Sequence, residues 1–125
     1  MLVTLALLLG CQADETVRAY GGADRVWILK ELNGAPFPAT ATLTFPPDGG
    51  IAGNAPCNRY SAPMTAPYPW FDAGPIAATK KACPDLSSEQ QFLEALQAVA
   101  LSEVAGRTLI LSNTEGLSLI FAATD

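Results

Sequence analysis

A strand and a turn follow one another in residues 25–34, RVWILKELNG. The first eight of these residues are rich in the aromatic, β-branched and aliphatic side chains that are common in strands. The pair Asn33-Gly34 is a strong turn signal, because such turns need residues that tolerate a positive φ. We therefore expect the folded domain to begin near Asp24, with a strand that ends in a tight turn.

The next segments predict a β-meander. Residues 40–45 alternate threonine with apolar side chains, and the sequence PPDGG at 46–50 has turn chemistry before a further strand that starts at Ile51. Proline is dense over residues 55–75, and proline disrupts both helices and central strands. We expect a long connection there, with one short edge strand.

The second half of the chain predicts one helix and a hairpin. Residues 87–90, SSEQ, resemble a capping box, and helical spacing follows, so we expect a helix from about Ser88 to Ala100. Its apolar side chains share one stripe: Phe92, Leu93, Leu96, Val99 and Ala100. After Gly106 apolar residues alternate on both sides of residues 113–116, which predicts a C-terminal hairpin. The expected fold class is α+β, mostly β, with one packed helix.

The N-terminal segment has the pattern of an export signal. Residues 1–10 are apolar and uncharged, and a polar run follows Cys11. The apolar stretch is shorter than the roughly 20 residues that a transmembrane helix needs. Residues 8–11, Leu-Leu-Gly-Cys, resemble the lipobox of bacterial lipoproteins. This resemblance implies a signal peptide over residues 1–10 and acylation of Cys11 by palmitate-type chains, which anchor a protein to a membrane.

Residues 11–23 are short and polar and contain Gly21-Gly22, so we expect a flexible tether between the membrane and a domain over residues 24–125. Gln12 favours the periplasmic face of the outer membrane over the inner membrane. No Lys or Arg precedes the apolar run, which departs from the lipoprotein pattern and favours a start codon further upstream. The alternative is an N-terminus that is disordered or packed in the core, with an ordinary buried Cys11.

Composition limits the class of protein. At 125 residues the chain has room for one domain, and its content of 50% hydrophobic and 15% charged residues is that of a globular protein. A net charge of -5 disfavours nucleic acid as a partner, because phosphate backbones bind clustered Lys and Arg. We expect a monomer.

The sequence shows no recognisable catalytic machinery. It contains no His, which excludes Ser-His-Asp and Cys-His catalysis and His-based metal sites. Asp48, Asp72, Asp85 and Glu89 are scattered over turns and a helix start, where carboxylates serve as caps, although an acid–base pair among them stays open. Two cysteines without further ligands cannot complete a usual zinc site. We expect no enzyme, no metal and no cofactor.

Two blocks of sequence stand out by their composition and spacing: Cys57-Asn58-Arg59-Tyr60, and Thr79-Lys80-Lys81-Ala82-Cys83 followed by the predicted helix. Together with Trp27, Leu32-Asn33-Gly34 and Leu43-Thr44-Phe45, they resemble the META domain of HslJ-type bacterial lipoproteins. The resemblance covers nearly everything after the tether. It implies a small, bent antiparallel sheet or partly open barrel with one helix packed across it.

The same resemblance implies a kind of function without a reaction. META domains are similar to the secretin pilotins, which bind lipid or a partner peptide in a hydrophobic cleft. Family members are associated with stress and antibiotic tolerance or with secretion, and the association supplies no catalytic residues. The loop through Pro67 and Pro69 is richer in proline than the family pattern, which affects whatever surface that loop presents.

Cys57 and Cys83 lie in the two blocks that most resemble the family, and an exported protein meets an oxidising environment in which neighbouring thiols pair. We therefore predict a disulfide that fixes the proline-rich connection to the sheet. Two buried free thiols are the alternative, because the sequence does not show the geometry that a disulfide requires.

Candidate binding residues are the aromatic side chains near the proline-rich connection, together with one cation: Tyr60, Tyr68, Trp70, Phe71 and Arg59. Core packing is the alternative for the aromatic residues, most of all for Tyr60 and for Trp27. We expect Asn58 to bond to loop backbone and Arg59 to pair with a carboxylate. Lys80-Lys81 forms either a solvated edge or a contact to lipid phosphates.

Taken together, these patterns predict a non-enzymatic envelope lipoprotein. We expect its membrane contact to be the lipid anchor, and its domain to bind a hydrophobic ligand or a protein partner in stress response, antibiotic tolerance or secretion. A small periplasmic hydrolase inhibitor, or a purely structural envelope protein, is the alternative.

Overall fold

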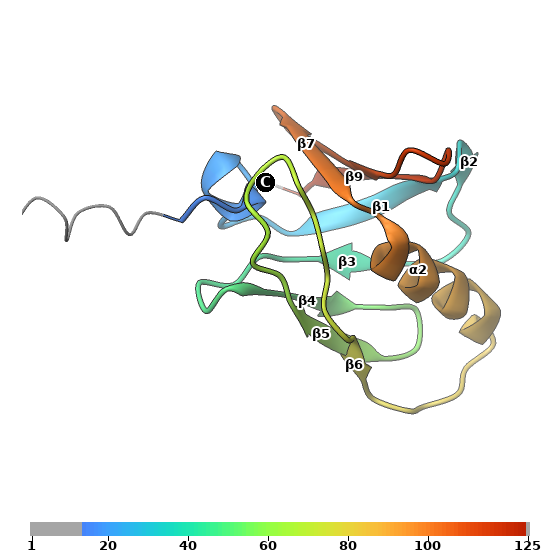
Figure 1. The fold of residues 1–125 in the computed structure, drawn as a ribbon. Coiled ribbons are helices and arrows are strands. Elements are labelled where there is room, and N and C mark those ends of the chain that lie inside the picture. Colours follow the sequence, from blue (N-terminus) through green and yellow to red (C-terminus); the bar gives the residue numbers. More distant parts are fainter. Residues whose placement is uncertain (1–13, 125) are drawn as a thin grey trace, which may run out of the picture.

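The computed structural model describes residues 14–124 (Figure 1). Its elements in chain order are η2 Val17–Tyr20, β1 Trp27–Leu32, β2 Ala35–Pro36, β3 Thr42–Leu43, β4 Gly50–Asn54, β5 Arg59–Pro63, β6 Ala77–Ala78, α2 Leu86–Ala98, β7 Leu101–Ala105, β8 Thr108–Ser112 and β9 Ser118–Ala123. All strand pairs are antiparallel, and the fold is α+β and mostly β, as predicted. No described helix is long and apolar enough to cross a membrane.

The strands form two sheets. The larger one has six strands in the order β2-β1-β9-β8-β7, with β3 paired to β1, and the smaller one has the order β4-β5-β6. Two predicted turns are confirmed: Asn33 and Gly34 both have positive φ between β1 and β2, and Gly116 has φ 94° between β8 and β9. The C-terminal strand β9 pairs along β1, so the two ends of the domain meet in one sheet.

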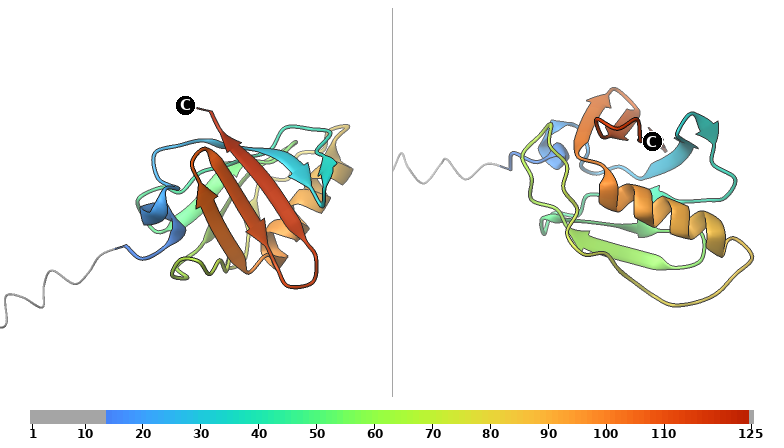
Figure 2. Two further views of the ribbon diagram at one scale, coloured as in Figure 1. Left: turned by 90° about the horizontal axis from the view of Figure 1, so that it is seen from above. Right: turned by 45° about the vertical axis from the view of Figure 1, so that its right-hand side comes forward.

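The two sheets do not close into a barrel, and α2 lies across the space between them (Figures 1 and 2). The stripe predicted for the helix is buried at Phe92, Leu96 and Val99. The alternating residues of the C-terminal hairpin are buried as well: Leu109, Leu111, Leu119 and Phe121. One continuous apolar core therefore joins the helix to both sheets.

Two local predictions were wrong. The helix begins at Leu86, two residues earlier than predicted, and its N-cap Asp85 makes no side-chain cap hydrogen bond. The predicted capping box of Ser87 and Gln90 does not form, because Ser87 lies inside the helix rather than at its N-cap. The proline-rich stretch also contains a central strand, β5, which lies between β4 and β6. This strand is tolerated because its one proline, Pro63, is its last residue.

The prediction of a flexible tether does not hold for residues 14–23. Val17 is fully buried in the core, and the short helix η2 begins with it. Gly22 is buried too, and a Cβ there would meet the ring of Phe45 at 3.0 Å, so this glycine serves close packing rather than flexibility. The domain thus begins before Asp24. The predicted signal peptide and Cys11 lie outside the described residues.

Candidate functional site

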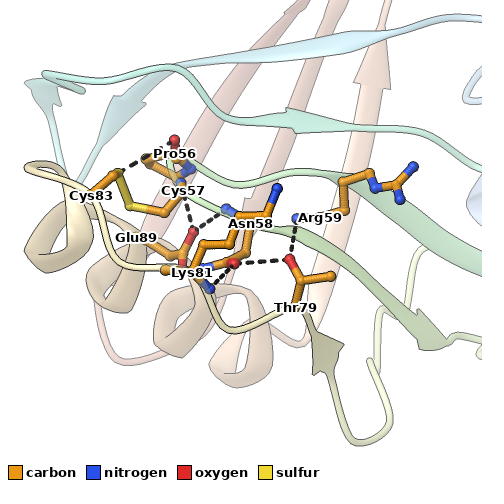
Figure 3. The surroundings of a disulfide bond; sticks show 8 residues. All are labelled: Pro56, Cys57, Asn58, Arg59, Thr79, Lys81, Cys83 and Glu89. Atoms are coloured by element: carbon orange, nitrogen blue, oxygen red, sulfur yellow. Dashed lines mark hydrogen bonds between the residues drawn. A yellow bond between two sulfur atoms is a disulfide. The ribbon is translucent and has the colours of Figure 1, made fainter.

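The predicted disulfide is present. Cys57, just before β5, and Cys83, in the connection before α2, are bonded with a Cα–Cα distance of 5.7 Å. The bond joins the small sheet to the segment that leads into the helix (Figure 3). Of the two outcomes left open by the sequence, pairing rather than free thiols is the one found.

A buried carboxylate lies beside the disulfide. Glu89 of α2 is 4% exposed, and its Oε1 accepts hydrogen bonds from the backbone N–H groups of Cys57 and Asn58, both at 2.8 Å. Its Oε2 accepts a third bond, from Asn58 Nδ2 at 2.6 Å (Figure 3). Burying a charge is costly unless donors surround it, and these three N–H groups supply that stabilisation.

The Asn58 side chain extends this network to the connection before the helix. Its Nδ2 also donates to the Lys81 carbonyl at 2.9 Å, and its Oδ1 accepts from Thr79 Oγ1 at 2.8 Å and from Lys81 N–H at 2.6 Å. The prediction that Asn58 bonds to loop backbone is confirmed. We call the disulfide together with Asn58 and Glu89 the clasp, because it holds β5, the connection and α2 together.

A cleft of about 620 Å³ opens beside the clasp. Its polar lining comes from Thr40, Asn54, Asn58, Arg59, Thr79 and Lys81. No described Asp or Glu lines the cleft. The cleft therefore contains no carboxylate partner for Arg59, although the sequence predicted that Arg59 pairs with a carboxylate. The Arg59 side chain is exposed and points away from the Asn58–Glu89 network (Figure 3). The cleft therefore combines polar side chains with two cationic residues, and Cys57 and Asn58 of the clasp form part of its lining.

Three of the aromatic candidates belong to the core. Trp27, Tyr60 and Phe71 are at most 4% exposed. The Tyr60 hydroxyl donates to the Thr42 carbonyl at 2.7 Å, and desolvation by burial raises the pKa of this phenol above its usual range. Tyr60 and Phe71 were candidate binding residues, and their burial excludes direct contact with a ligand at the surface of this structure.

Two candidates, Tyr68 and Trp70, lie on the surface in the connection between β5 and β6. The half-buried Tyr68 ring stacks on the Tyr20 ring, with centroids 4.7 Å apart and 9° between the planes. Its hydroxyl accepts from the Val104 N–H at 3.2 Å, while Trp70, which pairs with Leu101 of β7, is 56% exposed. We call Tyr20, Tyr68 and Trp70 the aromatic end.

Sequence reasoning missed two residues of these sites. Tyr20 was assigned to the tether, and its one sequence signal was an aromatic residue in an otherwise polar segment. Glu89 was assigned to the helix start, where carboxylates are favoured for capping and helix-dipole reasons. Its hydrogen-bond partners lie 31 and 32 positions away in the sequence. Both residues act through contacts that no local pattern displays.

Comparison with known proteins identifies the fold and no activity. The META domain family model matches residues 22–125. Among solved structures, a protein from Burkholderia xenovorans determined by NMR has a TM-score of 0.69 at 23% identity, covering 86% of this chain and 87% of its own. A duf4847 family protein from Bacteroides vulgatus ATCC 8482 has the same TM-score at 16% identity, covering 85% of this chain and 96% of its own. No curated protein matches.

Proposed function

Because the chain belongs to the META domain family, we propose that it is a non-enzymatic lipoprotein of the bacterial envelope whose domain binds a protein partner at the cleft beside the clasp. The observation that carries this proposal is the cleft itself, which combines Arg59 and Lys81 with polar side chains and no described carboxylate. A cleft of this kind suits an acidic segment of another protein.

The charge distribution supports an acidic partner. The chain carries a net charge of -5, yet three of its seven cationic side chains, Arg59, Lys80 and Lys81, come from the two blocks that form the clasp. A local excess of positive charge on an acidic protein favours partners of opposite charge at that one surface. Complementary charges of this kind make binding more specific and association faster.

The filling of the core favours a protein over an enclosed hydrophobic ligand. Twenty-one buried hydrophobic residues pack in one cluster between the sheets and the helix. The clefts found over residues 14–124 open to the surface, and the lining of the one beside the clasp includes the polar and charged residues Asn58, Arg59 and Lys81. The pilotin-like binding of lipid in a hydrophobic cleft therefore has less support than binding of a polypeptide.

The remaining parts of the proposal come from the sequence. The lipobox-like residues 8–11 support export and acylation of Cys11, and Gln12 supports the outer membrane. The absence of His from the chain supports a binding role over catalysis. The polar side chains of the clasp support the same role, because Asn58 and Glu89 are already bonded to backbone groups. The family resemblance supports a process connected with stress, antibiotic tolerance or secretion.

Site-specific crosslinking in the envelope tests the binding site. A photoreactive amino acid at position 40, which lines the cleft and leaves Arg59 and Lys81 in place, should capture one discrete partner through an acidic peptide. The charge reversal Lys81→Glu should abolish the crosslink. The matched reversal Lys30→Glu, at an exposed position on β1, should leave it unchanged.

Either of two results contradicts the proposal: no crosslink from position 40, or equal capture with Lys81→Glu and Lys30→Glu. If the captured protein is a hydrolase whose activity falls on addition of the purified chain, the alternative of a periplasmic hydrolase inhibitor is the correct one.

A further inference from the structure

The aromatic end and the clasp lie at opposite ends of the molecule. In Figures 1 and 2, η2 and the proline-rich connection lie side by side where the described chain begins, and the segment that leads into α2 lies at the far end. Hydrogen bonds agree with this arrangement, because the Tyr68 N–H donates to the Glu15 carbonyl at 2.6 Å. The aromatic end is therefore fixed to the N-terminal entry of the domain.

The aromatic end exposes much of its surface. Tyr20 is 54% exposed and Trp70 is 56% exposed, and with Val26 they are the exposed large hydrophobic residues of the described chain. Backbone contacts hold both in place: Trp70 N–H donates to the Pro67 carbonyl at 2.7 Å, and Gly21 approaches Val104 so closely that a Cβ there would lie 2.8 Å from a methyl group. Exposed aromatic side chains on a backbone held in this way are candidates for a contact surface.

Chain length limits how far this surface can lie from the expected lipid. Cys11 precedes Glu15 by four residues, and a fully extended chain spans at most about 3.3–3.6 Å per residue. Glu15, whose carbonyl accepts the bond from Tyr68, thus lies within roughly 14 Å of the Cys11 backbone. Because Val17 and Gly22 are buried and the Glu15 carbonyl is bonded to Tyr68, this segment does not form a long tether, and an anchor at Cys11 holds this end near the bilayer.

We propose that the aromatic end lies in the headgroup layer of the membrane and fixes the orientation of the domain on it. This inference rests on the proposed anchor at Cys11. Trp and Tyr favour the interface between lipid and water, where an apolar ring and a polar edge are both accommodated. Asp14 and Glu15 are exposed beside these rings, while Arg18 Nε donates to the Phe45 carbonyl. Contact with zwitterionic phosphatidylethanolamine therefore suits this end, and it does not need anionic lipid.

One consequence concerns the cleft. With the aromatic end against the lipid, Arg59 and Lys81 at the clasp face the aqueous space, where an acidic partner can reach them. The contact of Lys80-Lys81 with lipid phosphates, which the sequence left open, is then excluded by orientation.

Tryptophan fluorescence tests the orientation, because the two tryptophans differ in exposure. Trp27 is fully buried and Trp70 is 56% exposed, so a quencher in the headgroup region of the bilayer reports on Trp70. The full chain, extracted from the envelope, is reconstituted in vesicles of phosphatidylethanolamine and phosphatidylcholine, with and without phosphatidylcholine brominated near the headgroup. Its intact mass records whether Cys11 is acylated.

We expect brominated lipid to remove the Trp70 share of the emission and to leave Trp70→Phe unquenched. In the Trp70→Phe background, Lys80→Trp places a reporter at the clasp end and should also stay unquenched. Tyr20→Ser should reduce the quenching of Trp70, and circular dichroism should show that these surface variants stay folded.

Acylated protein with unquenched Trp70, or equal quenching at positions 70 and 80, overturns the proposed orientation and leaves the anchor intact. A mass without acylation overturns the anchor, and the orientation that rests on it falls as well.

Discussion

Glu89 shows how a residue can determine local structure without taking part in chemistry. Its carboxylate is 4% exposed and is held by three N–H donors from Cys57 and Asn58. Those donors belong to the segment that enters β5, whereas Glu89 belongs to α2. One side chain thus connects two elements that the sequence separates by about thirty residues.

Glu89→Gln should lower the free energy of unfolding by about 2 kcal/mol, because the new amide group directs a donor toward Asn58 Nδ2 and the charge-assisted bonds are lost. Urea unfolding followed by circular dichroism measures this change. Glu94→Gln, on the exposed face of the same helix, is the matched control and should change stability by less than about 0.5 kcal/mol. Equal effects of the two substitutions would show that Glu89 does not hold the clasp.

The burial of Tyr60 predicts how the stability of the fold depends on alkaline pH. Burial raises the pKa of its phenol in the folded protein, while in the unfolded chain the phenol ionises near pH 10. Above that pH the unfolded state loses the proton first, so stability should fall as the pH rises, and below it Tyr60 should cause no pH dependence. Tyr60→Phe should lower the free energy of unfolding at neutral pH by about 1 kcal/mol, because the bond to Thr42 is lost. Between pH 9 and 11 the free energy of unfolding of this variant should fall less than that of the original chain. Identical pH profiles would contradict this assignment.

At the scale of elements, hydrophobic periodicity predicted the strands and the helix well, and local motifs predicted their ends less well. The stripe through Phe92 and Leu96 identified α2, and alternation identified β8 and β9. The start of α2 was placed two residues too late, because Ser87 lies inside the helix rather than at its cap. The central strand β5 was misjudged because it pairs on both sides with strands that no local pattern identifies.

The disulfide should contribute about 3–4 kcal/mol to stability in the chain-entropy account, because Cys57 and Cys83 are 26 residues apart. Replacing both cysteines by serine should lower the unfolding free energy by that amount. Reductant should destabilise the original chain to the same degree and have no effect on the double variant. A chain that is indifferent to reductant would show that the bond contributes nothing.

The short helix η2 tests where the domain begins. Val17→Ala should lower the unfolding free energy by about 2 kcal/mol, since it removes fully buried methyl groups from the core. The same substitution at the exposed Val26 should cost less than about 0.5 kcal/mol. The urea midpoints of the two variants show whether the segment that contains Val17 belongs to the folded domain. Equal midpoints would support the flexible tether that the sequence predicted for this segment.

At the scale of the whole molecule, the fold class and the disulfide could be predicted, and the placement of sites could not. The Cys-Asn-Arg-Tyr and Thr-Lys-Lys-Ala-Cys blocks carried the resemblance to the META domain, which the comparison over residues 22–125 confirms. The sequence placed Tyr60, Tyr68, Trp70 and Phe71 in one binding group. Strand alternation instead buries Tyr60, the core takes Phe71, and Tyr20 joins Tyr68 at the surface.

At this scale we propose a domain with two functional ends: an aromatic end beside the proposed membrane anchor and a cationic cleft at the clasp. Both proposals depend on the proposal that the chain is an exported lipoprotein in an oxidising space. The intact mass of the natural protein from the envelope tests this claim most directly. We expect a chain that begins at Cys11, carries acyl chains and lacks two hydrogens because Cys57 and Cys83 are paired. A protein that retains residues 1–10, carries no lipid and has free thiols at both positions would contradict it.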